Sequence, residues 1–145
     1  MYDTECDGEA SMNYENERDK IWQRIEEADK FYIYGAQVVA YGVYTAIREV
    51  LKKCPEAFLV STMDNNPPVI DDITVTVLSE DISTDALIIV STPEIYHEEI
   101  KDKLIHYNLR NIIFVDTHTE YLIMSRYFRI LGRFKLLEDL PLYNK

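Results

Sequence analysis

The fold is decided by the stretch Phe31-Tyr-Ile-Tyr-Gly35-Ala-Gln-Val-Val-Ala40-Tyr-Gly42. Its first residues are aromatic or β-branched, as strands prefer, and the apolar residues after Gly35 follow a helical period. A strand that turns through a glycine into a helix is how a nucleotide-binding βαβ unit begins. The usual G-x-G-x-x-G pattern is incomplete, because its three positions read Gly35, Gln37 and Ala40. The stretch therefore predicts a binding crevice without specifying its ligand or a reaction.

Strand and helix patterns alternate along the rest of the chain. Strands are expected at 31–34, 57–60, 73–77, 86–90 and 111–115, and helices at about 14–30, 37–53, 92–108 and 117–131. Pro93 is expected at the first position of its helix, and Thr117 with Glu120 is expected to form a capping box. Right-handed crossovers then favour the strand order 3-2-1-4-5. The predicted fold is α/β, a Rossmann-like three-layer αβα sandwich with a five-stranded parallel sheet and an extra N-terminal helix.

Size and charge limit the class of protein. The chain has 145 residues, 47% of them hydrophobic, which suits one domain. Its net charge is −11, whereas binding to a phosphate backbone needs clustered Lys and Arg. No apolar run approaches the roughly 20 residues that span a bilayer, and no apolar signal segment follows Met1. We therefore expect a cytoplasmic protein that binds no nucleic acid and has no membrane span.

The acidic charge is concentrated at the N-terminus. Residues 1–30 contain ten acidic and four basic residues, so they contribute −6 of the total −11. Residues 1–12 lack apolar periodicity and are expected to form a mobile acidic arm. Residues 13–140 are expected to form the single domain, and 141–145 an exit segment towards a downstream domain.

The predicted crevice lies beyond the carboxyl ends of the strands, where the strand order reverses. Four loops reach this edge: 35–37, 61–66, 91–92 and 116–119. Backbone N–H groups at the start of the helix after Gly35 favour a phosphate or a carboxylate there. A side chain at Gly35 would then block the approach of a ligand to the backbone. The candidate binding residues are Gly35, Ala36, Gln37, Ser61, Asp64, Ser91, Thr92 and His97.

Three of these candidates also have a purely structural interpretation. Gly35 would serve only a tight turn, and the Asp64 segment, Asp-Asn-Asn-Pro, has good turn chemistry. His97 is either a hydrogen-bonding group at the mouth of the crevice or a half-buried structural histidine. The sequence has no nucleophile elbow, no Walker lysine and no clustered metal ligands, so we predict neither catalytic residues nor a metal site.

The chain contains 11 tyrosines, more than a small core can bury with satisfied hydroxyl groups. We therefore expect some of them to form an interface, including one in a homo-oligomer. The six candidates are Tyr41, Tyr44, Tyr96, Tyr107, Tyr121 and Tyr127.

Three segments carry a resemblance to a known group of proteins: 34–42, 69–75 and 92–100, which read YGAQVVAYG, VIDDITV and TPEIYHEEI. Together they resemble the Rossmann-like N-terminal domains that precede glycosyltransferase and related modules in bacterial capsule and surface-polysaccharide proteins. The similarity runs from about Phe31 to Leu140. It implies a nucleotide or nucleotide-sugar as ligand and a downstream glycosyltransferase domain as partner, so that this chain would be one domain of a longer protein.

A second, weaker similarity concerns Thr92-Pro93 and His97. This spacing resembles a T-P-x-x-x-H segment of sugar-related, NAD-dependent oxidoreductases of the glucose-fructose type. In those proteins the threonine-proline turn lies against the cofactor. The leading hypothesis is a noncatalytic or regulatory domain that binds a nucleotide or nucleotide-sugar. The alternatives are the NAD-binding domain of an oxidoreductase and a degenerate domain that acts only in assembly.

Overall fold

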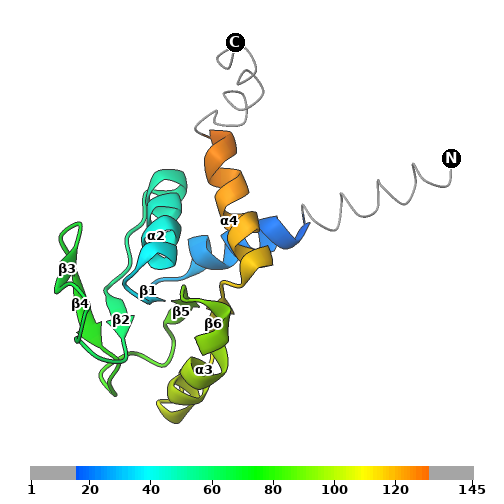
Figure 1. The fold of residues 1–145 in the computed structure, drawn as a ribbon. Coiled ribbons are helices and arrows are strands. Elements are labelled where there is room, and N and C mark those ends of the chain that lie inside the picture. The colour runs from blue at the N-terminus through cyan, green and yellow to red at the C-terminus, as the bar shows by residue number, and fades with distance from the viewer. Residues whose placement is uncertain (1–15, 131–145) are drawn as a thin grey trace, which may run out of the picture.

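The computed structural model describes residues 16–130. A first helix occupies residues 16–27. The elements that follow are β1 (Phe31–Tyr34), α2 (Val38–Leu51), β2 (Phe58–Val60), β3 (Val69–Ile70), β4 (Ile73–Val77), β5 (Leu87–Val90), the 3-10 helix η1 (Glu94–Tyr96), α3 (His97–His106), β6 (Ile112–Phe114) and α4 (Thr117–Ile130). Strands and helices alternate as predicted, and the fold is α/β (Figure 1). The predicted arm 1–12 and exit segment 141–145 lie outside the described residues.

The sheet is mixed and has six strands in the order β3-β4-β2-β1-β5-β6. Five of them are parallel, with β1 between β2 and β5, as the alternation predicted. The short strand β3 runs antiparallel to β4 at the edge. The prediction of a purely parallel, five-stranded sheet is therefore wrong in this respect, because the chain makes a hairpin before β4.

The hairpin was missed because its turn has unusual residues. Asp71 and Asp72 join β3 to β4, and both have positive φ, 50° and 69°. Such a two-residue turn normally contains Asn or Gly. Here Asp71 is held from outside the hairpin, since its carboxylate accepts hydrogen bonds from Tyr44 Oη at 2.5 Å and from Arg48 Nη1 at 2.6 Å. Tyr44 is thus buried with a satisfied hydroxyl, and it does not contribute to an exposed aromatic surface.

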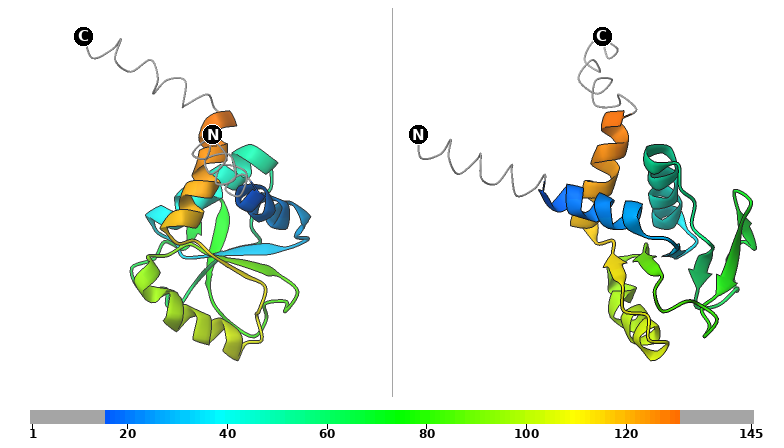
Figure 2. Two further views of the ribbon diagram at one scale, coloured as in Figure 1. Left: turned by 90° about the vertical axis from the view of Figure 1, so that its right-hand side faces the viewer. Right: turned by 180° about the vertical axis from the view of Figure 1, so that it is seen from behind.

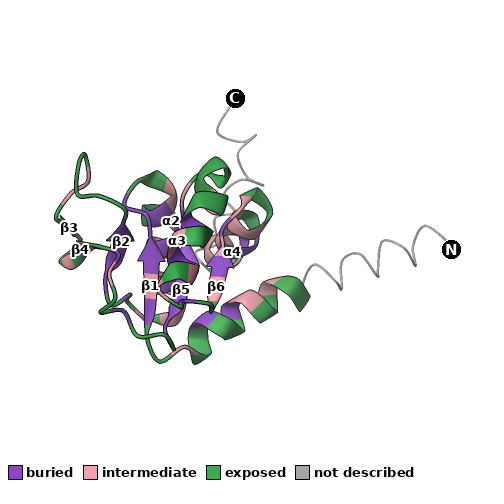
Figure 3. Ribbon diagram, turned by 90° about the horizontal axis from the view of Figure 1, so that it is seen from below, coloured by how far each residue is buried: buried purple, intermediate pink, exposed green. Residues whose placement is uncertain are grey.

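Side chains alternate between the two faces of the sheet and build two cores. Phe31 and Ile33 of β1 face the first core, with the N-terminal helix, α2 and α4, whereas Tyr32 and Tyr34 face the second, with α3. Figure 2 shows α2 and α4 on one side of the sheet and α3 on the other. Seen from below, the central strands are buried along most of their length (Figure 3). The described residues therefore form three layers, helices–sheet–helices.

Two helix starts differ from prediction. Pro93 precedes the short helix η1, so it does not open α3 itself. The N-cap of α4 is Asp116, whose Oδ1 accepts a hydrogen bond from Thr119 N at 2.7 Å. The prediction that Thr117 and Glu120 form a capping box is therefore wrong, because the aspartate directly before Thr117 supplies the cap and its own N–H donates to Phe114 O at 3.1 Å. None of the helices within residues 16–130 is both long and apolar enough to cross a membrane.

Candidate functional site

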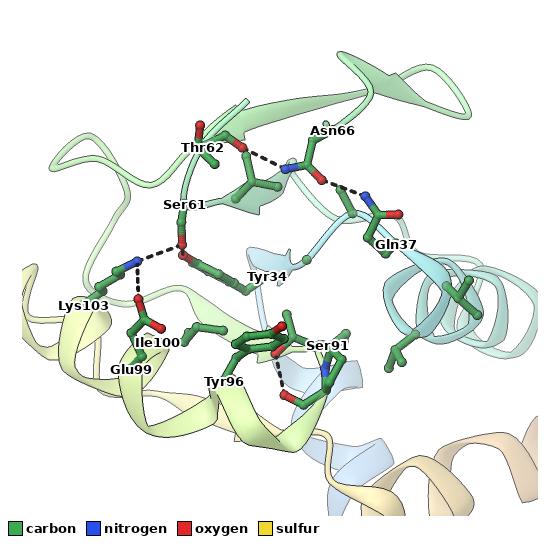
Figure 4. Close-up of a pocket in the computed structure, with 17 residues that line it drawn as sticks. Tyr34, Gln37, Ser61, Thr62, Asn66, Ser91, Tyr96, Glu99, Ile100 and Lys103 are labelled. Carbon is green, nitrogen blue, oxygen red and sulfur yellow. Dashed lines mark hydrogen bonds and ion pairs between the residues drawn. The ribbon is translucent and has the colours of Figure 1, made fainter. Parts of the chain in front are cut away.

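A cavity of about 580 Å³ opens at the carboxyl edge of the sheet, beyond β1, β2 and β5 (Figure 4). Its size lies in the usual range for sites that take small organic ligands. The start of α2 forms one wall, and η1 with α3 forms the facing wall. The lining residues come from four segments: 34–39, 60–62 with Asn66, 91–93, and Tyr96 with Glu99, Ile100 and Lys103.

The first turn of α2 is the source of hydrogen-bond donors in this cavity. Gln37 is the N-cap residue, but its side chain makes no cap hydrogen bond, and the first turn contains no acidic residue. The helical bonding begins with Tyr41 N–H, which donates to Gln37 O at 3.0 Å. The backbone N–H groups before Tyr41 thus precede the first intrahelical bond, and the helix dipole gives this end a partial positive charge. A phosphate or a carboxylate is the group that such an end attracts.

Gly35 lines the cavity and has a structural role there. Its φ is +125°, and a Cβ at this position would lie 2.6 Å from the carbonyl oxygen of Ser91. Its N–H donates to Leu59 O at 2.8 Å, so it is not free for a ligand. A side chain here would first collide with the end of β5, and its effect on the approach of a ligand stays a prediction. Gly35 allows β1 and β5 to approach and α2 to begin.

Gln37 links the two loops on one side of the cavity. Its Nε2 donates to Asn66 Oδ1 at 2.9 Å and to Asn65 O at 3.3 Å. Asn66 in turn donates to Thr62 O at 2.8 Å. The bonds of Asn66 with Gln37 and with Thr62 are drawn in Figure 4. Together with the bond to Asn65 O, they fix the loop after β2 against the start of α2. The residue that departs from the usual glycine pattern thus closes one side of the cavity.

A chain of polar groups crosses from β1 to α3. Tyr34 Oη lies 2.5 Å from Ser61 Oγ, and Lys103 Nζ donates to the same Oγ at 3.1 Å. Lys103 Nζ also pairs with Glu99 Oε1 at 3.4 Å, one helical turn away. Tyr34 reaches this position because alternate residues of β1 face α3. Lys103 is the one cationic side chain among the described residues that line the cavity.

The η1 wall is tied to α4 by Glu94. Its Oε1 accepts hydrogen bonds from Thr117 N at 2.6 Å and from Thr117 Oγ1 at 2.9 Å. These bonds, first the one from the backbone, lower the pKa of Glu94 below its usual value. The carboxylate therefore stays ionised at neutral pH. It fixes the base of the short helix from which Tyr96 faces the cavity.

Six of the eight predicted binding residues line this cavity: Gly35, Ala36, Gln37, Ser61, Ser91 and Thr92. His97 does not, because its Nε2 hydrogen-bonds to Thr92 O at 2.9 Å and its ring lies against Phe114, with centroids 5.4 Å apart. The structure thus gives His97 the structural role that was the alternative interpretation. Asp64 is exposed in the loop after β2, where its N–H donates to Thr62 Oγ1 at 3.2 Å, which is turn chemistry. Likewise, the loop 116–119 does not line the cavity.

Sequence reasoning missed the lining residues contributed by the α3 side, chiefly Tyr96, Ile100 and Lys103. Ile100 follows the helical apolar period and could have been assigned to the face of α3 that packs on the sheet. Lys103 lies one turn beyond it and carried no local signal. Its position opposite Ser61 depends on how α3 packs against the sheet.

Comparison with protein-family models finds no matching family, and comparisons with curated proteins and with solved structures find no match either. Within residues 16–130, no group of three or more His, Cys, Asp or Glu side chains is placed to hold a metal ion. The site is therefore interpreted from its own geometry.

Proposed function

We propose that this chain is a noncatalytic, Rossmann-like binding domain that takes a nucleotide or a nucleotide-sugar in the cavity beyond β1. We further propose that it serves a glycosyltransferase of surface-polysaccharide synthesis, as its sequence resemblance implies. The observation that carries the binding proposal is the position of the cavity. It lies where the strand order reverses, between β1 and β5, and the uncapped start of α2 forms one wall.

The lining supports a ligand with an anionic part and a less polar part. The first turn of α2 and Lys103 favour negative charge, whereas Val39, Tyr96 and Ile100 provide apolar walls. A nucleotide combines both features.

A titration series tests the proposal. Calorimetry of the protein with UDP, ADP, UDP-glucose and NAD, each up to millimolar concentration, should give heat for at least one compound. The absence of heat with every compound would contradict the proposal. Preference for NAD over the other compounds would favour the oxidoreductase alternative.

The informative variant is Val38→Asp. Val38 lines the cavity in the first turn of α2 and is 86% exposed, so the change costs little packing. A carboxylate there stabilises the helix by roughly 0.3–1 kcal/mol but repels an anionic ligand. Affinity should fall by about tenfold or more, since like charges about 4 Å apart repel by up to about 4 kcal/mol near a protein surface. Val38→Asn is the matched neutral control, and equal affinity of both variants would exclude an anion at this helix start.

Assembly is a second candidate function, favoured by exposed apolar side chains. Val38 is 86% exposed, Ile95 81% and Tyr121 57%. A chain that self-associates through them should show a concentration-dependent mass in light scattering. Ile95→Ser should reduce that association without changing nucleotide affinity, because Ile95 does not line the cavity.

A further inference from the structure

A second cavity, of about 460 Å³, adjoins the first one on the α3 side. Tyr34, Ser61 and Lys103 line both cavities, so their polar chain forms the boundary between them. The second cavity continues between the end of β4 and the C-terminal half of α3. Its further lining residues are Val77, Leu78, Asp102, His106 and Tyr107.

The two cavities differ in chemistry. The first has the apolar walls and the helix start described above. The second offers a carboxylate at Asp102, an imidazole at His106 and a phenol at Tyr107. The two rings pack edge to face, with centroids 5.1 Å apart. Carboxylates accept hydrogen bonds from hydroxyl groups, and aromatic rings with polar tips pack against ring faces while they hydrogen-bond at the edge. A ring rich in hydroxyl groups suits this lining.

Lys103 stands between the two cavities with donor capacity left. An ammonium group has three donors, of which the bond to Ser61 and the pair with Glu99 use two. Its side chain is 40% exposed, so the group can reorient towards a ligand. Lys103 is also the one cation among the described residues that line either cavity. An anionic group that lies across the boundary would meet this charge.

We infer that the site takes a two-part ligand, a nucleoside diphosphate joined to a sugar. The diphosphate lies between the start of α2 and Lys103, and the sugar occupies the second cavity against Asp102 and Tyr107. This inference rests on the proposed nucleotide site and deepens it, because it assigns one part of the ligand to the second cavity.

The test compares each nucleoside diphosphate with its sugar conjugates on the same protein. The probes are UDP, ADP and GDP, and for each the glucose and N-acetylglucosamine conjugates. We expect at least one conjugate to bind about tenfold tighter than its parent diphosphate, a gain of about 1.4 kcal/mol. In NMR spectra, the backbone amide signals of residues 102–107 should shift when that conjugate is added and not when the diphosphate is added.

Variants separate this inference from the proposed function. Asp102→Asn keeps the shape but removes the carboxylate, so it should abolish the preference for the conjugate and leave diphosphate affinity within about threefold, or about 0.7 kcal/mol. Glu98→Gln makes the same charge change on an exposed residue of α3 that lines neither cavity, and it should leave both affinities unchanged. Lys103→Met should weaken both classes of ligand.

The outcomes are distinct. If a diphosphate binds and none of its conjugates binds more than about threefold tighter, the two-part ligand is wrong and the nucleotide site stands. A conjugate preference that survives Asp102→Asn and shifts no signal in 102–107 also overturns the inference, because the sugar then lies elsewhere. If none of the probes binds, both the inference and the proposed function fail.

Discussion

Replacement of Gly35 by alanine tests how the site edge is built. Gly35 adopts φ +125°, a backbone conformation that side chains disfavour, and its missing Cβ leaves room for Ser91 O. A Cβ would lie 2.6 Å from that oxygen and 3.1 Å from Thr92 Cγ2. The Ser91 oxygen belongs to the backbone at the end of β5, so it cannot rotate away. Gly35→Ala must either strain its own backbone or separate the ends of β1 and β5.

The size of the effect follows from these two contributions. A residue forced into a sparsely populated backbone region costs about 1–3 kcal/mol. Displacement of the Ser91 carbonyl weakens the hydrogen bond that Ser91 N–H makes to Tyr34 O at 2.8 Å, worth about 1 kcal/mol. Alanine also restricts the unfolded chain, which stabilises the folded state by roughly 0.4–1 kcal/mol and offsets part of this loss. The net loss of unfolding free energy should be about 1–3.5 kcal/mol, and the melting temperature should fall by roughly 3–12 °C.

Gly42→Ala is the matched control. Gly42 lies inside α2, and a Cβ built there meets no atom within 4 Å beyond its chain neighbours and the backbone of its own helix. The same chemical change should stabilise the protein by about 0.5–1 kcal/mol, because alanine favours the helix. Urea unfolding followed by fluorescence measures both variants, since Trp22 is the single tryptophan and is 1% exposed. If the two variants differ by less than about 0.5 kcal/mol, the reasoning is refuted.

Three further predictions concern other contacts. Lys53 Nζ donates to three carbonyl oxygens at the end of the N-terminal helix, at 2.7–3.0 Å. Lys53→Met should therefore lower the free energy of unfolding, measured in urea, by about 1–3 kcal/mol. The control Lys52→Met, at a side chain that is 76% exposed, should lower it by less than about 0.5 kcal/mol. The hydrogen bond from Tyr44, followed by the charge of Arg48, lowers the pKa of Asp71; the stability that this adds is present above the ordinary pKa near 4 and is lost as pH falls through the lowered one. The difference in unfolding free energy between the protein and Asp71→Asn should accordingly shrink below about pH 4, and a constant difference from pH 3 to 7 would contradict it. His97→Asn should leave the affinity of any nucleotide that calorimetry detects within about tenfold, because His97 does not line the cavity and its ring hydrogen-bonds a backbone oxygen, that of Thr92.

The pattern of elements could be predicted from the sequence because it depends on neighbouring residues. Ala86-Leu-Ile-Ile-Val90 and the run at 31–34 are apolar throughout, as strands covered on both faces must be. The five parallel strands follow in the predicted order, since short right-handed crossovers leave few alternatives. The β3–β4 hairpin could not be predicted from the sequence, because its turn is stabilised by Tyr44 and Arg48, two residues more than 20 positions away.

The residues of the candidate site likewise fall into those that local sequence predicts and those that only packing brings to the site. The loops that end β1, β2 and β5 were predictable, because the carboxyl ends of parallel strands meet at one edge. Residues on the facing wall were not, since the contact of Lys103 with Ser61 joins positions 42 apart. His97 and Asp64 have the residue types of a binding site, yet local hydrogen bonds direct both of them elsewhere. The sequence by itself determined the succession of strands and helices and the edge at which a site would lie, because periodicity and turn chemistry act over a few residues. Only the tertiary structure decided which side chains meet across that edge, because the packing of α3 on the sheet brings together groups that share no local pattern.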